Sequence, residues 1–162
     1  MRIEEDYIAH GKKYHVAYND VDSFGHLPQE KITQHYGVCY LGNEIVICWH
    51  EKKKEWSLPG GKREPGEDIE GTLRREVEEE TNMRVVSHKP IGYQEVFSED
   101  GASIIQLRSF CIVEPLGEFV SDPAGHVTAI KCIHPSKFNE YIDWGTIGDR
   151  IIERAEETRK HL

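Results

Sequence analysis

The hydrophobic positions of this chain follow a strand period in several stretches. Two of them, Ile32–Leu41 and Glu44–His50, are rich in apolar and β-branched residues, and the Gly42-Asn43 pair between them is typical of a tight turn. We expect them to form a β-hairpin. The remaining extended segments are predicted at residues 14–17, at 84–97 with a break near Pro90, at 103–113 after a turn at Gly101, and at 127–134.

A helical period appears in two other places. Apolar residues recur at every fourth position at Ile69, Leu73 and Val77, directly after the acidic pair Glu67-Asp68. This pattern predicts an amphipathic helix whose apolar stripe faces a core. A second such helix is predicted at residues 146–161, after a short helix at 136–141 that begins at Pro135. The apolar face of the helix at 146–161 consists of Ile147, Ile151, Ile152 and Ala155. Strands together with flanking helices indicate the α/β class.

Three glutamates of the first predicted helix share one side of it. At 100° per residue, Glu76, Glu79 and Glu80 fall within about a third of the circumference, and Glu78 points nearly opposite. Like charges spaced in this way cost about 0.2–0.5 kcal/mol per pair. A hard divalent cation reverses that sign, because Mg²⁺ and Mn²⁺ take oxygen ligands. The alternative is a solvated charged face, which needs no particular residues outside the helix.

The residues around this helix do keep a fixed spacing. The series runs through Gly61, Glu67, Arg75-Glu76, Val77, Glu79, Glu80 and Met83. It resembles the Nudix box, G-x5-E-x7-R-E-U-x-E-E-x-G-U, where U is a bulky apolar residue. Asn82 replaces the usual glycine at the helix end. Asn is the next most tolerant residue of the left-handed conformation, so the departure costs about 1 kcal/mol or less and leaves the chemistry intact.

The resemblance implies a Nudix-type α/β/α sandwich with a mixed central sheet. It also implies a metal-dependent pyrophosphohydrolase that cleaves a nucleoside diphosphate linked to another moiety, with Mg²⁺ or Mn²⁺ as cofactor. The implied metal ligands are the carboxylates of Glu76, Glu79 and Glu80 and the carbonyl of Gly60. The implied supporting residues are Gly61, Glu64, Glu67 and Arg75, where Arg75 orients either Glu64 or Glu67 by charge-assisted hydrogen bonds.

Glu79 and Glu80 are also candidates for positioning the attacking water. Family members often add an acidic residue from a distant loop, and residues 118–126 lie where that loop is expected. Asp122 is the first candidate there, with Glu118 and His126 as alternates, and each is equally well explained as a solvated loop residue. The family markers for ADP-ribose and for dinucleoside polyphosphates are absent from residues 98–101, so no substrate-binding residue is assigned.

Two alternative functions fit the same fold. A non-catalytic nucleotide-binding module would be expected to lose one or more box glutamates, and all are present here. A diphosphate isomerase needs a catalytic cysteine and further metal-binding histidines. The four cysteines lie in apolar runs without C-x-x-C spacing, which predicts reduced core residues.

Length and composition limit the number of domains and the kinds of molecule that the protein is expected to bind. The chain has 162 residues, which predicts a single Nudix domain over residues 1–162, with 1–30 as an N-terminal strand and loop segment and 61–83 as the box. Its net charge is −9 and its only basic cluster is residues 52–54, so an extended nucleic acid is disfavoured and a small phosphorylated substrate is expected. No 18-residue apolar run or signal-peptide pattern occurs, and we expect a cytoplasmic protein that binds no membrane. The sequence leaves a homodimer open.

Overall fold

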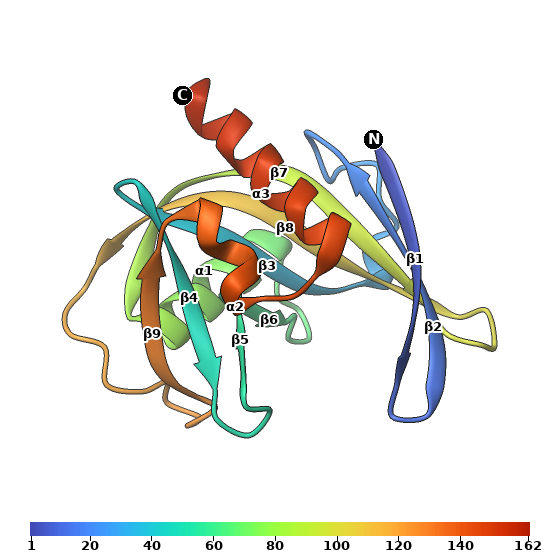
Figure 1. Ribbon diagram of the computed structural model, residues 1–162, viewed down its shortest axis with the longest axis horizontal. Helices are drawn as coiled ribbons and strands as arrows, with labels where there is room; N and C mark the ends of the chain where they lie inside the picture. The colour runs from blue at the N-terminus through green and yellow to red at the C-terminus, as the bar shows by residue number, and fades with distance from the viewer.

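The computed structural model describes residues 1–162 and places nine strands and three α-helices along the chain (Figure 1). The strands are β1 (Arg2–Ala9), β2 (Lys12–Asp20), β3 (Ile32–Leu41), β4 (Glu44–His50), β5 (Glu55–Ser57), β6 (Gly60–Lys62), β7 (Met83–Phe97), β8 (Ser103–Pro115) and β9 (Val127–Ile133). The helices are α1 (Ile69–Thr81), α2 (Phe138–Tyr141) and α3 (Gly145–Lys160), with 3₁₀ turns at Gln29–Lys31 and Pro135–Lys137.

The sheet is mixed. Its strand order is β1-β2-β7-β8-β3-β4-β5, with β6 paired to β3 and β9 paired to β4. Strands β3 and β8 are parallel, and every other pair is antiparallel. Only two residue pairs join β3 to β4, so β4, β5 and β9 diverge from the larger sheet beyond the Gly42 turn.

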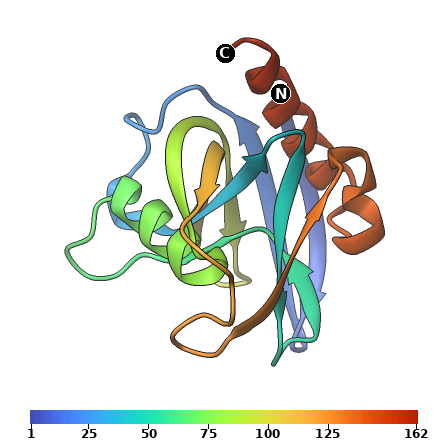
Figure 2. The same ribbon diagram turned by 90° about the vertical axis from the view of Figure 1, so that its left-hand side faces the viewer.

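The helices cover opposite faces of this sheet. Figure 2 shows α1 on the left, the strands in the middle, and α2 and α3 on the right. Alternate residues of β3 point to opposite faces of the sheet. Cys39 belongs to the apolar cluster that contains Leu73 of α1, and Val38 belongs to the cluster that contains Ile151 of α3. This arrangement confirms the predicted α/β/α class with a mixed central sheet.

Most predicted elements are confirmed, including the β3–β4 hairpin, the box helix and the C-terminal helix. The break near Pro90 is a register shift inside one continuous strand, β7. The prediction for residues 1–30 was wrong in extent. In place of one short strand with loops, residues 2–20 form the β1–β2 hairpin, whose turn residues His10 and Gly11 have φ of 52° and 76°.

Burial agrees with the interpretation of the cysteines. All four are free thiols, and Cys39, Cys48 and Cys111 are buried in the core. None of the helices combines the length and apolar character needed to cross a bilayer.

Candidate functional site

Helix α1 is fixed at both ends by its own sequence. The Asp68 carboxylate caps the N-terminus by accepting a hydrogen bond from the Gly71 N–H at 2.6 Å. Leu73 and Val77 are fully buried against the sheet, as their spacing predicts. At the C-terminus Asn82 adopts the left-handed conformation with φ 54°, the role usually taken by glycine.

This anchoring gives four glutamates in the second half of the helix, at positions 76, 78, 79 and 80, different environments. Glu80 is only 6% exposed, and its Oε1 accepts a hydrogen bond from the Gly60 N–H at 2.8 Å. Glu76 and Glu79 are partly buried, and Glu78 is exposed. The structure therefore separates Glu78 from the other three, as the helical period predicts.

The glycines of the preceding turn are required by close packing. Gly60 has φ of 150°, and a Cβ there would lie 2.4 Å from the His35 carbonyl oxygen. A Cβ at Gly61 would lie 2.7 Å from the Glu76 carboxyl group. A larger residue at Gly60 would therefore clash with the backbone of β3, whereas a larger residue at Gly61 would displace the Glu76 carboxylate.

Burial raises the pKa values of two of the helix glutamates, Glu76 and Glu80. It raises the pKa of Glu80 to about 8, against the effect of the Gly60 N–H, and the negative charges of Glu76, Asp122 and Glu79 raise it further. The pKa of Glu76 is also raised, chiefly by burial. Three carboxylates crowded in this way are a site of excess negative charge that a bound cation would stabilise.

Arg75 holds the loop in front of the helix. Its Nε and Nη2 donate to the two oxygens of Glu67 at 2.7 and 3.0 Å, and its Nη1 donates to Glu76 at 2.9 Å and to Glu79 at 3.3 Å. Of the two partners that the sequence left open, Glu67 makes the bidentate contact. Glu64 is exposed and lies 3.7 Å away. These bonds lower the pKa of Glu67 to about 2.

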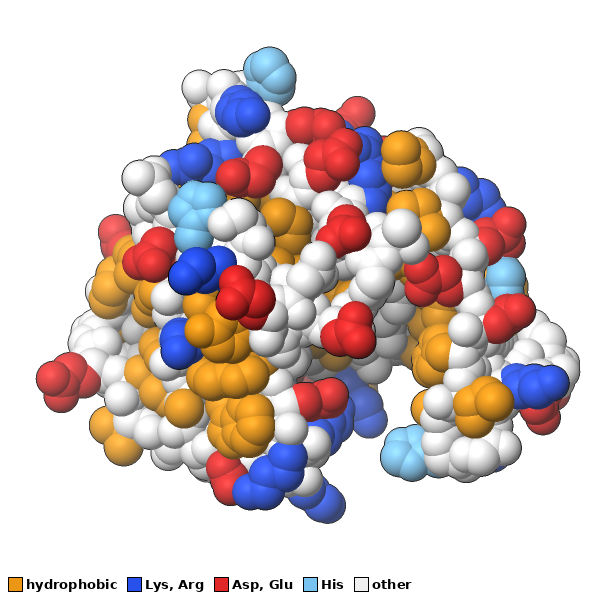
Figure 3. Space-filling view, in the orientation of Figure 1, with side chains coloured by type: hydrophobic (Ala, Val, Ile, Leu, Met, Phe, Trp, Pro, Cys, Tyr) orange, Lys and Arg blue, Asp and Glu red, His pale blue; other side chains and the backbone are white.

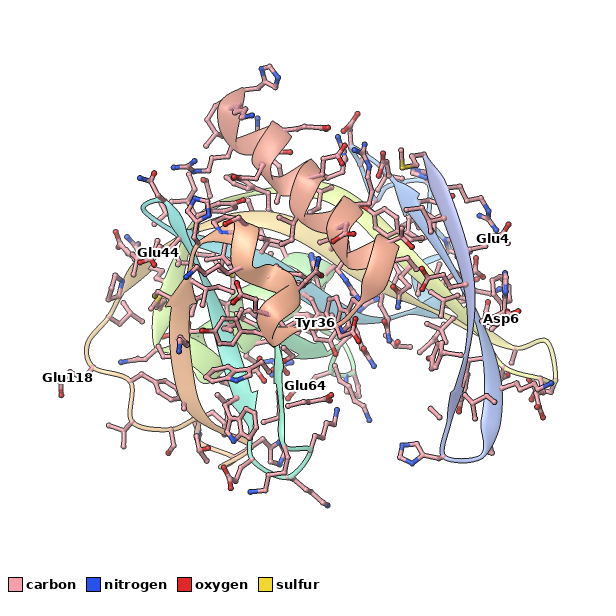
Figure 4. The ribbon with its side chains drawn as sticks, viewed as in Figure 1. Glu4, Asp6, Tyr36, Glu44, Glu64 and Glu118 are labelled. Atoms are coloured by element: carbon pink, nitrogen blue, oxygen red, sulfur yellow. The ribbon has the colours of Figure 1, made fainter.

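The downstream loop brings one acid close to Glu80. Asp122 is 6% exposed, and its two oxygens accept the backbone N–H groups of His126 at 3.0 Å and Val127 at 2.7 Å. Its charge contributes to the raised pKa of Glu80. Glu118 and His126 are exposed, and Figure 4 shows Glu118 at the outer edge of the molecule, far from Tyr36 and Glu64.

His50, which ends β4, lies near this site and is not predicted from the sequence. Its Nε2 lies 3.9 Å from Glu80 Oε2, and burial lowers its pKa so that the imidazole is neutral at neutral pH. The available signal was a histidine at the end of an apolar strand that precedes the box.

These residues suit a hard divalent cation by their chemistry. The donors are carboxylate oxygens, which Mg²⁺ and Mn²⁺ prefer, and two of them have pKa values raised by burial. No group of three or more acidic, histidine or cysteine side chains is already arranged around a common point in the structure. The carboxylates are instead engaged by Arg75 and the Gly60 N–H.

An open pocket of about 820 Å³ adjoins the box loop. Lys62, Arg63 and Glu64 line it on one side, and Thr33 and Gln34 of β3 line it on the other. Figure 3 also shows the molecule hollowed at its lower margin, between the β1–β2 hairpin on the right and the rest of the chain. The pocket is lined by the box loop, and Glu76, Glu79 and Glu80 are not among its lining residues.

Comparison with known proteins adds sequence and fold relationships. A family model described as "NUDIX domain" matches residues 33–154. A Bacillus subtilis protein, YtkD, provisionally assigned as an 8-oxo-dGTP diphosphatase, is 35% identical over 95 residues. The match covers 58% of this chain and 59% of that protein, so less than two thirds of the relative is spanned.

Solved structures share the fold at low sequence identity. A variant of the Bacillus subtilis pyrophosphohydrolase BsRppH superposes with a TM-score of 0.72 at 20% identity, covering 88% of this chain and 92% of that one. A C. elegans Ap4A hydrolase superposes with a TM-score of 0.55 at 18% identity, covering 80% and 99%. At these identities the likeness establishes the architecture alone.

Proposed function

Because this chain belongs to the Nudix family, we propose that it is a Mg²⁺- or Mn²⁺-dependent pyrophosphohydrolase that acts on a nucleotide or nucleotide derivative. The observation that carries the proposal is the position of Glu80. It is buried, joined to the box turn through the Gly60 N–H, and surrounded by further carboxylates. A helix that only needed a solvated face would have no reason to bury this charge.

The proposed ligands are the carboxylates of Glu76, Glu79 and Glu80 with the Gly60 carbonyl. A divalent cation held there supplies neutralisation of the phosphate oxygens and the leaving group. Arg75 fixes the orientation of Glu76 and Glu79 through its Nη1. Among the three glutamates Glu79 has the most exposed side chain, at 41%, which makes it the proposed acceptor of a proton from the attacking water.

Asp122 has a different place in this proposal. Both of its oxygens already accept backbone N–H groups, which fits a residue that shapes the loop and adds negative charge near Glu80. We therefore place proton transfer at Glu79 and assign Asp122 to positioning the loop. His50, neutral and close to Glu80, is proposed to limit the freedom of that carboxylate.

The names of the relatives indicate a substrate class. They are an 8-oxo-dGTP diphosphatase, a pyrophosphohydrolase and an Ap4A hydrolase, and two of these names specify purine nucleotides. We propose a purine nucleoside polyphosphate as the substrate. The isomerase alternative is disfavoured, because the thiols that precede the box are poor catalytic groups. A hydrogen bond with Cys111 and burial raise the pKa of Cys39, and burial raises the pKa of Cys48.

A substrate panel tests this function. Nucleoside di- and triphosphates, dinucleoside polyphosphates and nucleotide sugars are incubated with the protein and Mg²⁺, and the products are separated by ion-exchange chromatography. Cleavage of an anhydride bond to give a nucleoside monophosphate is the expected result. Absence of cleavage across the panel at high protein concentration would contradict the proposal.

A further inference from the structure

Arg108 is the most unusual charged residue outside the glutamate cluster. It lies in the middle of β8, is 3% exposed, and makes no ion pair. Its Nη1 donates to the Leu107 carbonyl at 3.2 Å, its Nη2 donates to Gln106 Oε1 at 3.4 Å, and its Nε is buried without a partner. A buried charge is costly unless it is paired, so the fold alone gives no reason to keep it.

The guanidinium lies against two aromatic rings and is almost completely buried, so a ligand reaches its donors only by replacing Gln106 or the neighbouring side chains. Its Cζ lies 4.8 Å from the centre of the Tyr36 ring and 5.4 Å from that of Trp144. Burial lowers the pKa of Arg108 to about 10, so it remains charged at neutral pH. A cation stacked in this way can still donate hydrogen bonds in its plane.

Strand register places Arg108 at a defined distance from the proposed metal ligands. Gly60 pairs with Tyr36, and Tyr36 pairs with Arg108, so the three lie side by side on β6, β3 and β8. Two strand spacings separate Gly60 from Arg108, which is roughly 10 Å. The Tyr36 hydroxyl is within electrostatic reach of Arg108 and of Glu76 and Glu80. This backbone spacing is comparable to the distance in a nucleotide between its phosphate and the far edge of its base.

The side chains around Arg108 are neutral and partly exposed. The Tyr36 hydroxyl donates to Gln34 Oε1 at 2.9 Å, and Gln34 lines the pocket beside the box loop. Gln94 donates to Gln106 Oε1 at 3.2 Å. Aromatic rings and amides suit a heteroaromatic ring better than a phosphate group, which would bring more negative charge than one arginine neutralises.

We propose that Arg108 is a specificity-determining residue that donates to the O6 and N7 acceptors of a 6-oxopurine base in the substrate. This inference rests on the proposed function and names the base that the site selects. Arginine commonly makes this paired contact with guanine, whereas adenine presents an amino donor at the same edge. Tyr36 and Trp144 lie beside the guanidinium as stacking surfaces for the base.

The test compares GTP, ITP, 7-deaza-GTP and ATP as substrates of the wild type and of Arg108→Met. Wild type should favour GTP and ITP over ATP, and 7-deaza-GTP should be poorer than GTP because it lacks N7. Arg108→Met should reduce kcat/KM for GTP and ITP by roughly 10- to 100-fold and change that for ATP by less than about twofold. Equal losses for GTP and ATP, or a wild type without preference, would overturn the proposal.

Two further variants guard against a purely structural effect. Arg108→Lys keeps the charge and loses the paired donors, so it should also lose the preference for GTP. It decides the matter if Arg108→Met does not fold. Arg84→Met changes an exposed arginine of the neighbouring strand β7, which is paired with Glu114, and should leave the ratio of GTP to ATP unchanged.

Equilibrium binding separates this proposal from that of hydrolysis. GMP and AMP are titrated into wild type and Arg108→Met without metal, by calorimetry. Selective binding of GMP that is lost in Arg108→Met would support the base site even if no substrate in the panel is cleaved. Equal affinity of the wild type for GMP and AMP, or no binding of GMP, would overturn it.

Discussion

At the scale of single residues, consecutive glutamates of α1 have different proposed roles: Glu79 and Glu80 are proposed metal ligands, and Glu78 is not. Glu78 is exposed, whereas Glu79 is partly buried beside Arg75 and Glu80 is buried beside Gly60. The assignment depends on direction around the helix and not on residue type. It therefore separates a site from a generally acidic helix.

We predict that Glu79→Gln or Glu80→Gln lowers turnover by at least 100-fold while stability holds or rises slightly. Each removes a charged ligand at nearly constant volume, and a bound metal supplies several kcal/mol of transition-state stabilisation, with each 1.36 kcal/mol worth about tenfold in rate. Glu78→Gln is the matched control and should change the rate little. Steady-state kinetics would contradict the site if Glu78→Gln were as damaging as its neighbours.

A second prediction concerns Glu67 and acid stability. Its pKa is about 2 in the folded protein against an ordinary value of 4.5, because Arg75 donates to its ionised form. The folded state therefore holds fewer protons than the unfolded state between these values, and stability falls as pH decreases from about 4.5 to 2. Urea unfolding should show that Glu67→Gln is less stable at pH 6 and that its deficit shrinks below pH 4.5. A constant deficit across this range would contradict the assignment.

The sequence is informative about some of these residues and silent about others. Helical period alone places Glu76, Glu79 and Glu80 together, because it depends only on local geometry. It does not choose Glu67 over Glu64, since both lie in a loop. It also gives no sign that Arg108 lacks a partner, because that depends on long-range packing.

At the scale of elements, the N-terminal hairpin shows why local pattern was insufficient. Strand β1 reads Arg-Ile-Glu-Glu-Asp-Tyr-Ile-Ala, and its acidic residues have low strand propensity. Both of its faces are largely exposed, so it lacks clean alternation. Pairing along its full length with β2 holds it in place, and the His10-Gly11 turn was the local signal.

For α1 we predict that Asp68→Ala lowers the free energy of unfolding by about 1 kcal/mol, within a range of roughly 0.5–2 kcal/mol. The substitution removes the acceptor of the Gly71 N–H at the helix start. Asp68→Ser retains a capping oxygen and should recover most of the loss, as measured by urea unfolding. A stability unchanged in Asp68→Ala would show that the cap does not hold this helix.

At the scale of the whole molecule, an ion pair joins the N-terminal hairpin to the last helix. Asp20 of β2 accepts a hydrogen bond from Arg150 Nη2 of α3 at 2.6 Å, and both side chains are largely buried. Strand β2 also pairs with β7. These contacts support our inference that residues 1–162 form a single domain, although the family model begins at residue 33.

We predict that Asp20→Asn lowers the free energy of unfolding by about 1–3 kcal/mol, because it weakens charge-assisted hydrogen bonds to a shielded arginine. Asp22→Asn is the control. Asp22 pairs with Arg154 but is 94% exposed, so its loss should cost less than about 1 kcal/mol. Urea unfolding of both variants would contradict the inference if they behaved alike.

The central claim is that the glutamate face of α1 acts through a divalent cation. The most direct measurement follows the hydrolysis of a nucleotide that the substrate panel identifies as a substrate. One protein sample is assayed first with Mg²⁺, then with excess chelator, and then with Mg²⁺ restored. Circular dichroism monitors the fold throughout. Activity should vanish with chelator and return with Mg²⁺, and the fold should persist because buried Leu73 and Val77 hold the helix. Full turnover in the presence of chelator would contradict the account.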